Sequence, residues 1–362
     1  MDIEKLTEKA AADLAGMPEL AFNENATKAY IRDFIGTHTD LELHDRGRYL
    51  YAVHREEGED TLAFRADFDA VPTTCGAAHL CGHNGHTASL LGLALLLSGK
   101  RIGRSVVLLF QPAEETGEGA PACLDLFDKE RIDAIIGAHN IPGEPFAAVI
   151  LKHGTFACAS CGMEIKLKGR PAHAAYPENG INPTAALAEL ALRIPELASS
   201  LSREYGCMTL ATPVGLKAGE RAFGMSASEA ELWITLRSES AEAFERLVNG
   251  AGSLADSLAA RDRLGITVGL FDEFPATVND RALVDAAENV LNKDKLPYKY
   301  VEVPFRWSED FGHYAARTRS LFMGIGSGTD TAPLHTAQYA YPKGLAFRTA
   351  RIFFCLACGI RF

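Results

Sequence analysis

The stretch Cys81-Gly82-His83-Asn84-Gly85-His86-Thr87 packs one thiol and two imidazoles into six residues, and the apolar run 90–97 follows almost at once. Side chains two residues apart in an extended chain point the same way, so Cys81 and His83 can reach a common point. Thiolate and imidazole are ligands that zinc and similar ions prefer. Taken alone, the stretch fits equally well a buried cysteine and a histidine that opens a helix. The flanking sequence decides between these interpretations.

Strand and helix patterns alternate on both sides of this stretch. Residues 61–65, 105–110 and 133–138 are short apolar runs typical of buried strands, and residues 87–98 predict a helix between the first two. Such alternation with short loops predicts a mainly parallel mixed sheet flanked by helices, an α/β domain. Sites in sheets of this kind lie at the carboxyl ends of the strands.

Groups that can bind metal or transfer protons gather at these predicted strand ends and around the opening stretch. A mixed set of thiolate, imidazole and carboxylate suits zinc, manganese or cobalt better than magnesium or calcium. Eight such groups are too many for one tetrahedral ion, whereas a two-metal site would use them. The groups are Asp67, Asp69, Cys81, His83, Glu114, Glu115, His139 and His335.

Adjacent Glu114 and Glu115 offer a general base beside a metal ligand. Neighbouring side chains in extended backbone diverge, so one can bind metal while the other faces a water molecule. These residue types alone do not say which glutamate has which role. A solvated acidic loop is the alternative interpretation of the pair.

The pattern changes near residue 158. Residues 163–167 and 231–236 alternate like half-exposed strands, and residues 183–197 and 241–260 predict helices, which together indicate a two-layer α+β domain.

Outside this α+β region the chain predicts further elements of the α/β domain. Near the start of the chain, helices are expected at 2–16 and at 25–35, the second ended by Gly36. The α/β pattern resumes after it with a helix at 281–291 and strands near 299–303 and 320–324. We therefore expect a discontinuous catalytic domain of residues 1–157 and 272–362, interrupted by an inserted lid or dimerisation domain of residues 158–271.

Composition excludes several classes of protein. A chain of 362 residues with 47% hydrophobic and 23% charged residues is an ordinary globular protein long enough for two domains. Its net charge of −11 argues against binding nucleic acid. The acidic start lacks the basic region of a secretion signal, and no apolar run approaches a membrane span, so we expect a cytoplasmic protein that does not bind membranes. The eight cysteines are scattered and do not form a disulfide framework.

Seven motifs in order resemble the M20 metallopeptidase family, specifically the amidohydrolase branch that includes aminoacylases, hippurate hydrolases and auxin-conjugate hydrolases. The resemblance spans nearly the whole chain, and seven ordered motifs are far more specific than any one of them. The motifs are Phe64-Arg65-Ala66-Asp67-Phe68-Asp69-Ala70-Val71-Pro72, residues 81–87, Gln111-Pro112-Ala113-Glu114-Glu115, Gly137-Ala138-His139, residues 169–175, Ser308-Glu309-Asp310-Phe311 and Leu334-His335-Thr336.

This resemblance implies a binuclear site holding two divalent metal ions, such as manganese, zinc, cobalt or nickel. Glu114 would be the general base, and Asp69 would orient a ligand and raise its basicity. Asp67 is a weaker candidate for the same role, with a solvated carboxylate as its alternative. The ligands would be Cys81, His83, Glu115, His139 and His335.

The inserted domain would contribute to the substrate site. In the family, the histidine equivalent to His173 helps hold the carbonyl oxygen of the substrate, and the inserted domain often mediates homodimerisation. Arg221 could meet a substrate carboxylate, although a solvated arginine is the alternative. Two positions depart from the family pattern. Asn84 stands where the branch usually has Asp, which removes a negative charge beside the ligands and would weaken or retune metal binding. Residues 224–228 lack the segment that lines the substrate site in relatives, so the substrate specificity of the branch does not transfer to this chain.

The expected reaction is hydrolysis of the amide bond of an N-acyl amino acid or a related small amide. A metal-activated water, deprotonated by Glu114, would attack the carbonyl, and the products would be a carboxylic acid and a free amino acid. Two alternatives remain open: a dipeptidase or aminopeptidase of the same family, and a non-catalytic metal-containing protein that binds small molecules.

Overall fold

The computed structural model describes residues 2–58, 60–74 and 76–361, so Cys75 lies outside the described residues. The chain forms two compact units, a larger one made of Met1–Phe156, Thr277–Pro304 and Glu309–Phe362, and an inserted one made of Ala157–Ala276 and Phe305–Ser308. The inserted unit extends past the expected boundary at residue 271 and includes the short segment 305–308. The described residues contain no helix with the length and apolar character needed to cross a membrane.

The larger unit is built on a mixed sheet that has eight strands within the described residues. Its central pairs, β6 with β3, β3 with β7 and β7 with β16, are parallel, whereas β1, β2 and β8 join by antiparallel pairing. The predicted α/β class is therefore confirmed. In spatial order the strands are β1 (Glu42–Asp45), β2 (Leu50–His54), β6 (Ser105–Gln111), β3 (Thr61–Asp67), β7 (Ala134–Ile141), β16 (Arg319–Gly326), β8 (Val149–Leu151) and β15 (Tyr298–Tyr300).

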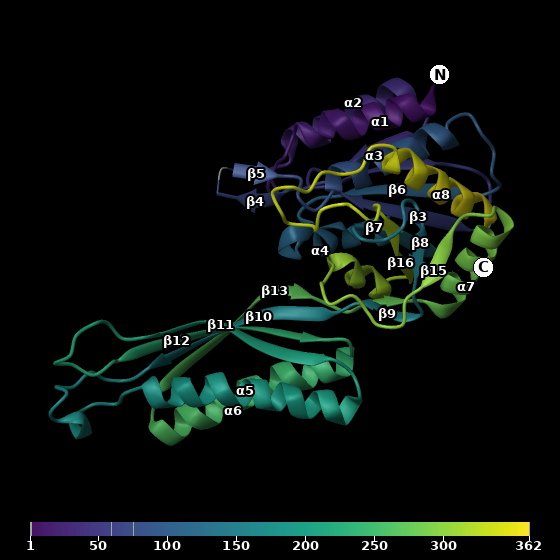
Figure 1. The fold of residues 1–362 in the computed structure, drawn as a ribbon. Coiled ribbons are helices and arrows are strands. Elements are labelled where there is room, and N and C mark those ends of the chain that lie inside the picture. The colour runs from purple at the N-terminus through teal and green to yellow at the C-terminus, as the bar shows by residue number, and fades with distance from the viewer. Residues whose placement is uncertain (1, 59, 75, 362) are drawn as a thin grey trace. The chain divides into compact units, whose positions relative to one another are not determined.

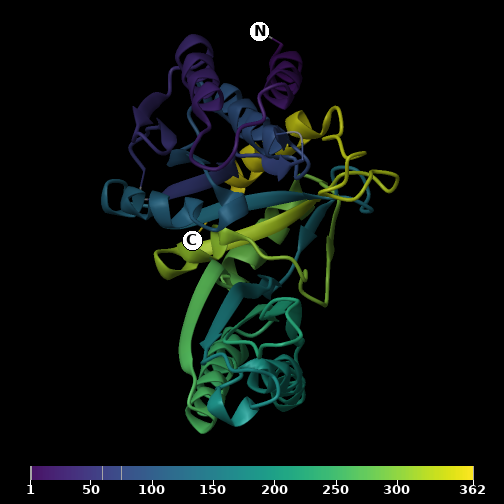
Figure 2. The same ribbon diagram turned by 90° about the vertical axis from the view of Figure 1, so that its left-hand side faces the viewer.

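Helix α3 (His83–Leu97) is almost wholly buried, as the apolar run in its second half predicts. It packs against α1 (Ile3–Ala15), α8 (Leu345–Gly359) and the sheet, and Figures 1 and 2 both show α1 beside it. α3 begins earlier than the predicted start at residue 87, because Gly82 takes φ 100° immediately before it. A Cβ at Gly82 would lie 2.5 Å from the Asn140 side chain, so glycine is needed there.

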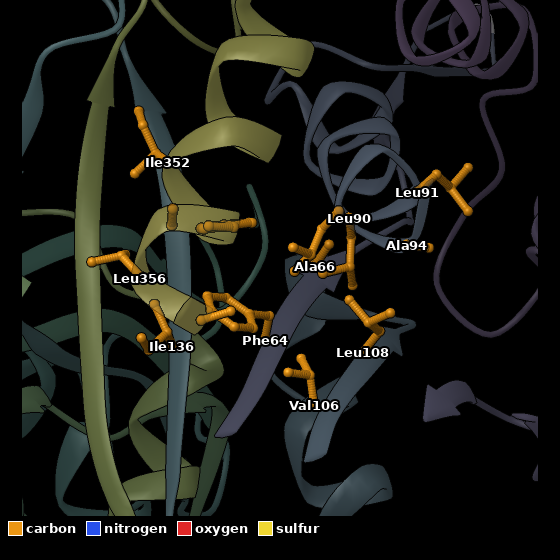
Figure 3. Close-up of a cluster of buried hydrophobic side chains, with 14 of the residues drawn as sticks. Phe64, Ala66, Leu90, Leu91, Ala94, Val106, Leu108, Ile136, Ile352 and Leu356 are labelled. Carbon is orange, nitrogen blue, oxygen red and sulfur yellow. The ribbon is translucent and has the colours of Figure 1, made fainter. Parts of the chain in front are cut away.

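The hydrophobic core lies between the sheet and these helices. Figure 3 shows Phe64 and Ile136 of the sheet pointing toward Ile352 and Leu356 of α8, with side chains of α3 on the other side of the cluster. The ring centroids of Phe64 and Phe353 lie 5.0 Å apart. Apolar burial on this face stabilises the larger unit by roughly 25 cal/mol for each Å² removed from water.

Shorter elements complete the larger unit. Helix α2 (Asn25–His38) continues through Gly36, where the prediction ended it, and stops only where Thr39 becomes extended. Helix α7 (Arg281–Lys293) is capped by Asp280, whose side chain accepts the Leu283 amide. The others are β4 (Val71–Thr73), β5 (Gly76–Ala78), η1 (Glu114–Thr116), α4 (Gly119–Cys123), η2 (Leu124–Asp128), β9 (Gly154–Ala157), β14 (Thr277–Asn279) and η4 (Asp310–Ala316).

The inserted unit is a two-layer α+β sandwich. Its antiparallel sheet runs β11 (Thr209–Ala218), β12 (Glu229–Ser238), β10 (Ala159–Lys168), β13 (Gly265–Phe274). Helices α5 (Thr184–Tyr205) and α6 (Ala241–Asp262) lie side by side on one face (Figure 1), and the short η3 (Pro177–Asn179) precedes α5. The two central strands were predicted, but the edge strands were not, because most of their residues are at least partly exposed.

In the larger unit, a buried arginine lies on the face of the sheet opposite the hydrophobic core that contains Phe64 and Ala66. Arg65 of β3 is 2% exposed and sits 2.6 Å from an Asp67 carboxylate oxygen and 2.7 Å from an Asp310 oxygen. Its Nε donates to Gln111 at 2.7 Å. Charges removed from water in this way are tolerated when they are paired and hydrogen-bonded. Arg65 therefore ties η4 to the ends of β3 and β6.

Replacing Arg65 by Met should lower the free energy of unfolding by about 3–5 kcal/mol, because the substitution leaves buried carboxylates without their cation. Urea unfolding followed by circular dichroism would measure the change. The matched control is Arg131→Met, which removes an exposed pair with Asp133 and should cost less than about 1 kcal/mol. Equal effects of the two substitutions would contradict the role given to Arg65.

Candidate metal centre

The candidate residues meet at one edge of the sheet. β3, β6 and β7 pair in parallel, so their carboxyl ends lie together. Asp69 follows β3 and Glu114 follows β6, while His139 lies inside β7 near its end. The first turn of α3 brings His83 to the same edge.

One group of potential ligands surrounds the Cys81 thiol. Its Sγ lies 3.3 Å from His139 Nε2 and 3.3 Å from His335 Nε2. The His335 amide donates to the Leu80 carbonyl at 2.8 Å, which fixes His335 beside Cys81 although the two are far apart in sequence. His335 has φ 60°, a left-handed conformation that non-glycine residues adopt rarely and that often marks functional sites.

A second group surrounds His83. Its Nε2 lies 3.7 Å from Glu115 Oε1 and 3.8 Å from Glu114 Oε2. His335 joins the two groups, since its Nε2 is also 3.9 Å from Glu115 Oε1. Atoms that bind one ion at about 2.1 Å lie roughly 3–4 Å from each other, which is the spacing seen here.

The residues present fit divalent ions. Within the described residues, His83 Nε2 and Glu115 Oε1 are buried and have no hydrogen-bond partner. A buried polar atom without a partner is costly unless another group, such as a metal ion, satisfies it. Nitrogen, sulfur and carboxylate oxygen together suit a transition metal. Groups of donor atoms close enough to share an ion include Cys81 with His83 and His139, and Cys81 with Glu115 and His335.

Asp69 orients both a histidine and a glutamate. Its Oδ1 lies 3.0 Å from His83 Nδ1, and its Oδ2 accepts the Glu115 amide at 3.0 Å. The first contact directs the proton of the imidazole to Nδ1 and leaves Nε2 with a free lone pair, the state in which a histidine can bind a metal ion. The carboxylate thus holds the two parts of the centre in register.

Asp67 lies beside the centre, with its Oδ2 3.8 Å from His83 Nε2, and it begins a buried chain of hydrogen bonds that runs through His86. His86 Nδ1 lies 2.6 Å from Asp67 Oδ1, and His86 Nε2 lies 2.5 Å from Asn140 Oδ1. Asn140 in turn donates to the Tyr339 hydroxyl at 2.6 Å. Both nitrogens of His86 are engaged in this chain, which packs the loop against the strands.

Glu114 has the environment that a general base needs. Its side chain is buried, and burial raises the pKa of the carboxyl, with the nearby carboxylates of Glu309 and Glu115 raising it further. A carboxyl with a raised pKa holds and releases protons closer to neutral pH. Asp310 begins η4, and Glu309 is the residue before it. The sequence analysis placed both residues in a family motif but gave them no role in the site. The available signal was a pair of acidic residues directly before the apolar Phe311.

The other two predicted site residues lie in the inserted unit. His173 is exposed, and its Nδ1 accepts the Ala175 amide at 3.1 Å. That bond places the proton of a neutral ring on Nε2, which makes Nε2 a donor. Arg221 is exposed in the β11–β12 connection, the region that also carries residues 224–228.

Asn84 holds α3 to α1. Its side chain is 5% exposed, and Nδ2 donates to the Ala11 carbonyl at 3.2 Å. An aspartate would place a carboxylate oxygen against that carbonyl, and a buried carboxylate without a donor is unfavourable. The amide at this position is therefore explained by helix packing.

We expect Asn84→Asp to lower the free energy of unfolding by about 1–3 kcal/mol, because it exchanges a hydrogen bond for a buried charge. Thermal or urea unfolding at neutral pH would measure it, and the loss should shrink as the pH falls and the new carboxyl becomes protonated. Asn23→Asp is the control, since exposed Asn23 makes a similar bond to Ala21. An Asn84→Asp protein as stable as the parent would contradict this explanation.

Comparisons with known proteins agree with this geometry. The sequence profile of peptidase family M20/M25/M40 matches residues 63–353. N-acetylcysteine deacetylase of Bacillus subtilis (strain 168) is 30% identical over 340 residues, covering 88% of this chain and 87% of that protein. IAA-amino acid hydrolase ILR1-like 4 of Arabidopsis thaliana is 30% identical over 337 residues, covering 85% and 74%.

A solved structure shares the fold over nearly the whole chain. The crystal structure of the Bacillus subtilis YXEP protein, described as a dinuclear metal binding peptidase from the M20 family, superposes with a TM-score of 0.82. It is 25% identical and covers 98% of each chain.

Proposed function

Because the chain belongs to peptidase family M20/M25/M40, we propose that the edge of its larger sheet is a two-metal centre that hydrolyses the amide bond of N-acylated amino acids. The observation that carries the proposal is that the donor atoms of Cys81, His83 and His139 lie close enough to share one ion, and those of Cys81, Glu115 and His335 lie close enough to share another. Relatives named as an N-acetylcysteine deacetylase and an amino acid conjugate hydrolase support an acylated amino acid as the substrate.

The proposed ligands are those that the family resemblance implied. Two divalent ions bound there would polarise the amide carbonyl and lower the pKa of a water molecule. Manganese, zinc, cobalt and nickel all suit this set of donors. Asp69 would keep His83 and Glu115 in place for binding, as its contacts to both residues indicate. The ligands are Cys81, His83, Glu115, His139 and His335.

Glu114 moves the protons of the reaction. Its carboxylate takes a proton from the attacking water and later gives it to the nitrogen of the leaving amine. One buried residue thereby serves as base and then as acid. This role requires a carboxyl that is close to the ligands without being one of them, and Glu114 Oε2 lies 3.8 Å from His83 Nε2.

The inserted unit supplies substrate contacts. His173 Nε2 donates to the carbonyl oxygen as negative charge develops on it, which stabilises the transition state more than the substrate. Arg221 pairs with the substrate carboxylate. The unit also serves as the surface for homodimerisation, supported by the edge strand β11, where Val214 and Leu216 are more than half exposed. A cytoplasmic location stays a prediction from the sequence.

Glu114→Gln should lower kcat for an N-acetyl amino acid by about 10²- to 10⁴-fold, because the amide cannot transfer the proton. Metal content measured by elemental analysis should stay unchanged. Exposed Glu118, which contacts Thr116 at the other end of the same loop, provides the control: Glu118→Gln should keep the parent activity. A Glu114→Gln enzyme with parental turnover would remove Glu114 from the mechanism.

A further inference from the structure

The loop that carries Glu114 and Glu115 begins with a strained residue. Ala113 is fully buried and has φ 51° and ψ 39°, the left-handed conformation. An L-residue with a Cβ adopts this conformation at a cost in free energy, because the Cβ approaches the carbonyl oxygen. The surrounding structure must therefore hold Ala113 in place.

A carboxylate from a distant part of the chain contacts Ala113. Glu24 Oε1 accepts the Ala113 amide at 3.0 Å, across 89 residues of sequence. Glu24 lies at the start of α2 and is 1% exposed, so its carboxylate is removed from water. Its side chain makes no capping hydrogen bond to its own helix. The contact therefore serves the loop and leaves the helix uncapped by this residue.

A second carboxylate anchors the loop two residues later. Asp69 accepts the Glu115 amide at 3.0 Å, so the backbone is fixed immediately before and immediately after Glu114. The Ala113 carbonyl is also engaged, since it accepts the Gly119 amide at 3.0 Å. A Cβ at Gly119 would lie 1.8 Å from the Pro112 carbonyl oxygen, so the loop closes tightly on itself. The direction of the Glu114 side chain follows from these anchors.

We propose that Glu24 is a positioning residue for Glu114, acting through the hydrogen bond to the Ala113 amide. The bond selects the left-handed conformation of Ala113 and with it the direction in which the Glu114 carboxylate enters the centre. Asp69 performs the same task from the other side. The proposal rests on the proposed role of Glu114 as general base.

Glu24→Ala should lower kcat about tenfold or more, because small displacements of a catalytic group cost large factors in rate. KM and metal content should stay near the parent values. Glu24→Gln keeps an oxygen that accepts the amide, so its loss in kcat should be smaller. Amide hydrogen exchange measured on peptides covering residues 111–119 should rise in Glu24→Ala, which reports the lost bond without using activity.

The control and the rescue variants separate positioning from general stability. Glu19 comes from the same segment, and its carboxylate accepts the Ala26 and Thr27 amides at the start of α2. Glu19→Ala should therefore lower the melting temperature and keep kcat. Glycine adopts the left-handed conformation freely. The double variant Ala113→Gly/Glu24→Ala should therefore have a kcat at least threefold higher than that of Glu24→Ala alone.

Parental kcat in Glu24→Ala, unchanged exchange at residues 111–119, or failure of Ala113→Gly to restore any activity would each overturn the proposal. If Glu24→Ala proves too unstable to purify, Glu24→Leu, which fills the buried space but cannot accept the Ala113 amide, takes its place in the comparison with and without Ala113→Gly. An inactive parent enzyme would count against the proposed function, whereas the exchange measurement would still report on the contact between Glu24 and Ala113.

Discussion

The Asp69 carboxylate holds the candidate centre together. One oxygen meets the His83 imidazole and the other meets the Glu115 amide, so a single side chain sets the distance between the first turn of α3 and the loop after β6. The parallel pairing of β3 with β6 and β7 brings those loops to one edge. The sheet topology thus brings the candidate ligands close together, and Asp69 orients two of them, His83 and Glu115, for metal binding.

The electrostatics of this edge explain why cations belong there. Five of the buried carboxylates are Asp67, Asp69, Glu114, Glu309 and Asp310, and Arg65 pairs with three of them. Burial raises the pKa of Glu309 to about 8. Carboxylates so close to each other repel unless cations neutralise them, and bound divalent ions are often the largest charges in such sites. Metal binding would therefore stabilise the folded chain as well as assemble the centre.

Sequence patterns predicted the features that depend on periodicity and motif. The buried strands of the larger sheet are continuous apolar runs, and the chemistry-bearing residues follow their ends, so both could be found by reading along the chain. The first residue of a helix was harder to predict. Helix α3 begins at His83, directly after Gly82, whose left-handed conformation a pattern of apolar residues does not encode. The edge strands β11 and β13 lack a buried face along most of their length.

Long-range polar contacts were out of reach of such patterns. Nothing local distinguishes Glu24 from other acidic residues at a helix start, yet it contacts Ala113 across the fold. Arg65 gave a faint signal, because it is a charged residue between Phe64 and Ala66 in an apolar strand. Two of its carboxylate partners, Glu309 and Asp310, come from late in the chain. Such partners follow from tertiary structure, because a buried charge is stable only where the fold supplies its counterions.

The most direct test of the two-metal centre is elemental analysis of protein purified without chelator, coupled to detection of amine released from N-acetyl amino acids and from free dipeptides. About two ions per chain, with release from the acylated substrates, is the expected result. Absence of bound metal even after addition of manganese, zinc or cobalt would contradict the assignment of Cys81 and His83 as ligands. Two ions per chain without release from any amide would contradict hydrolysis and favour a protein that only binds small molecules.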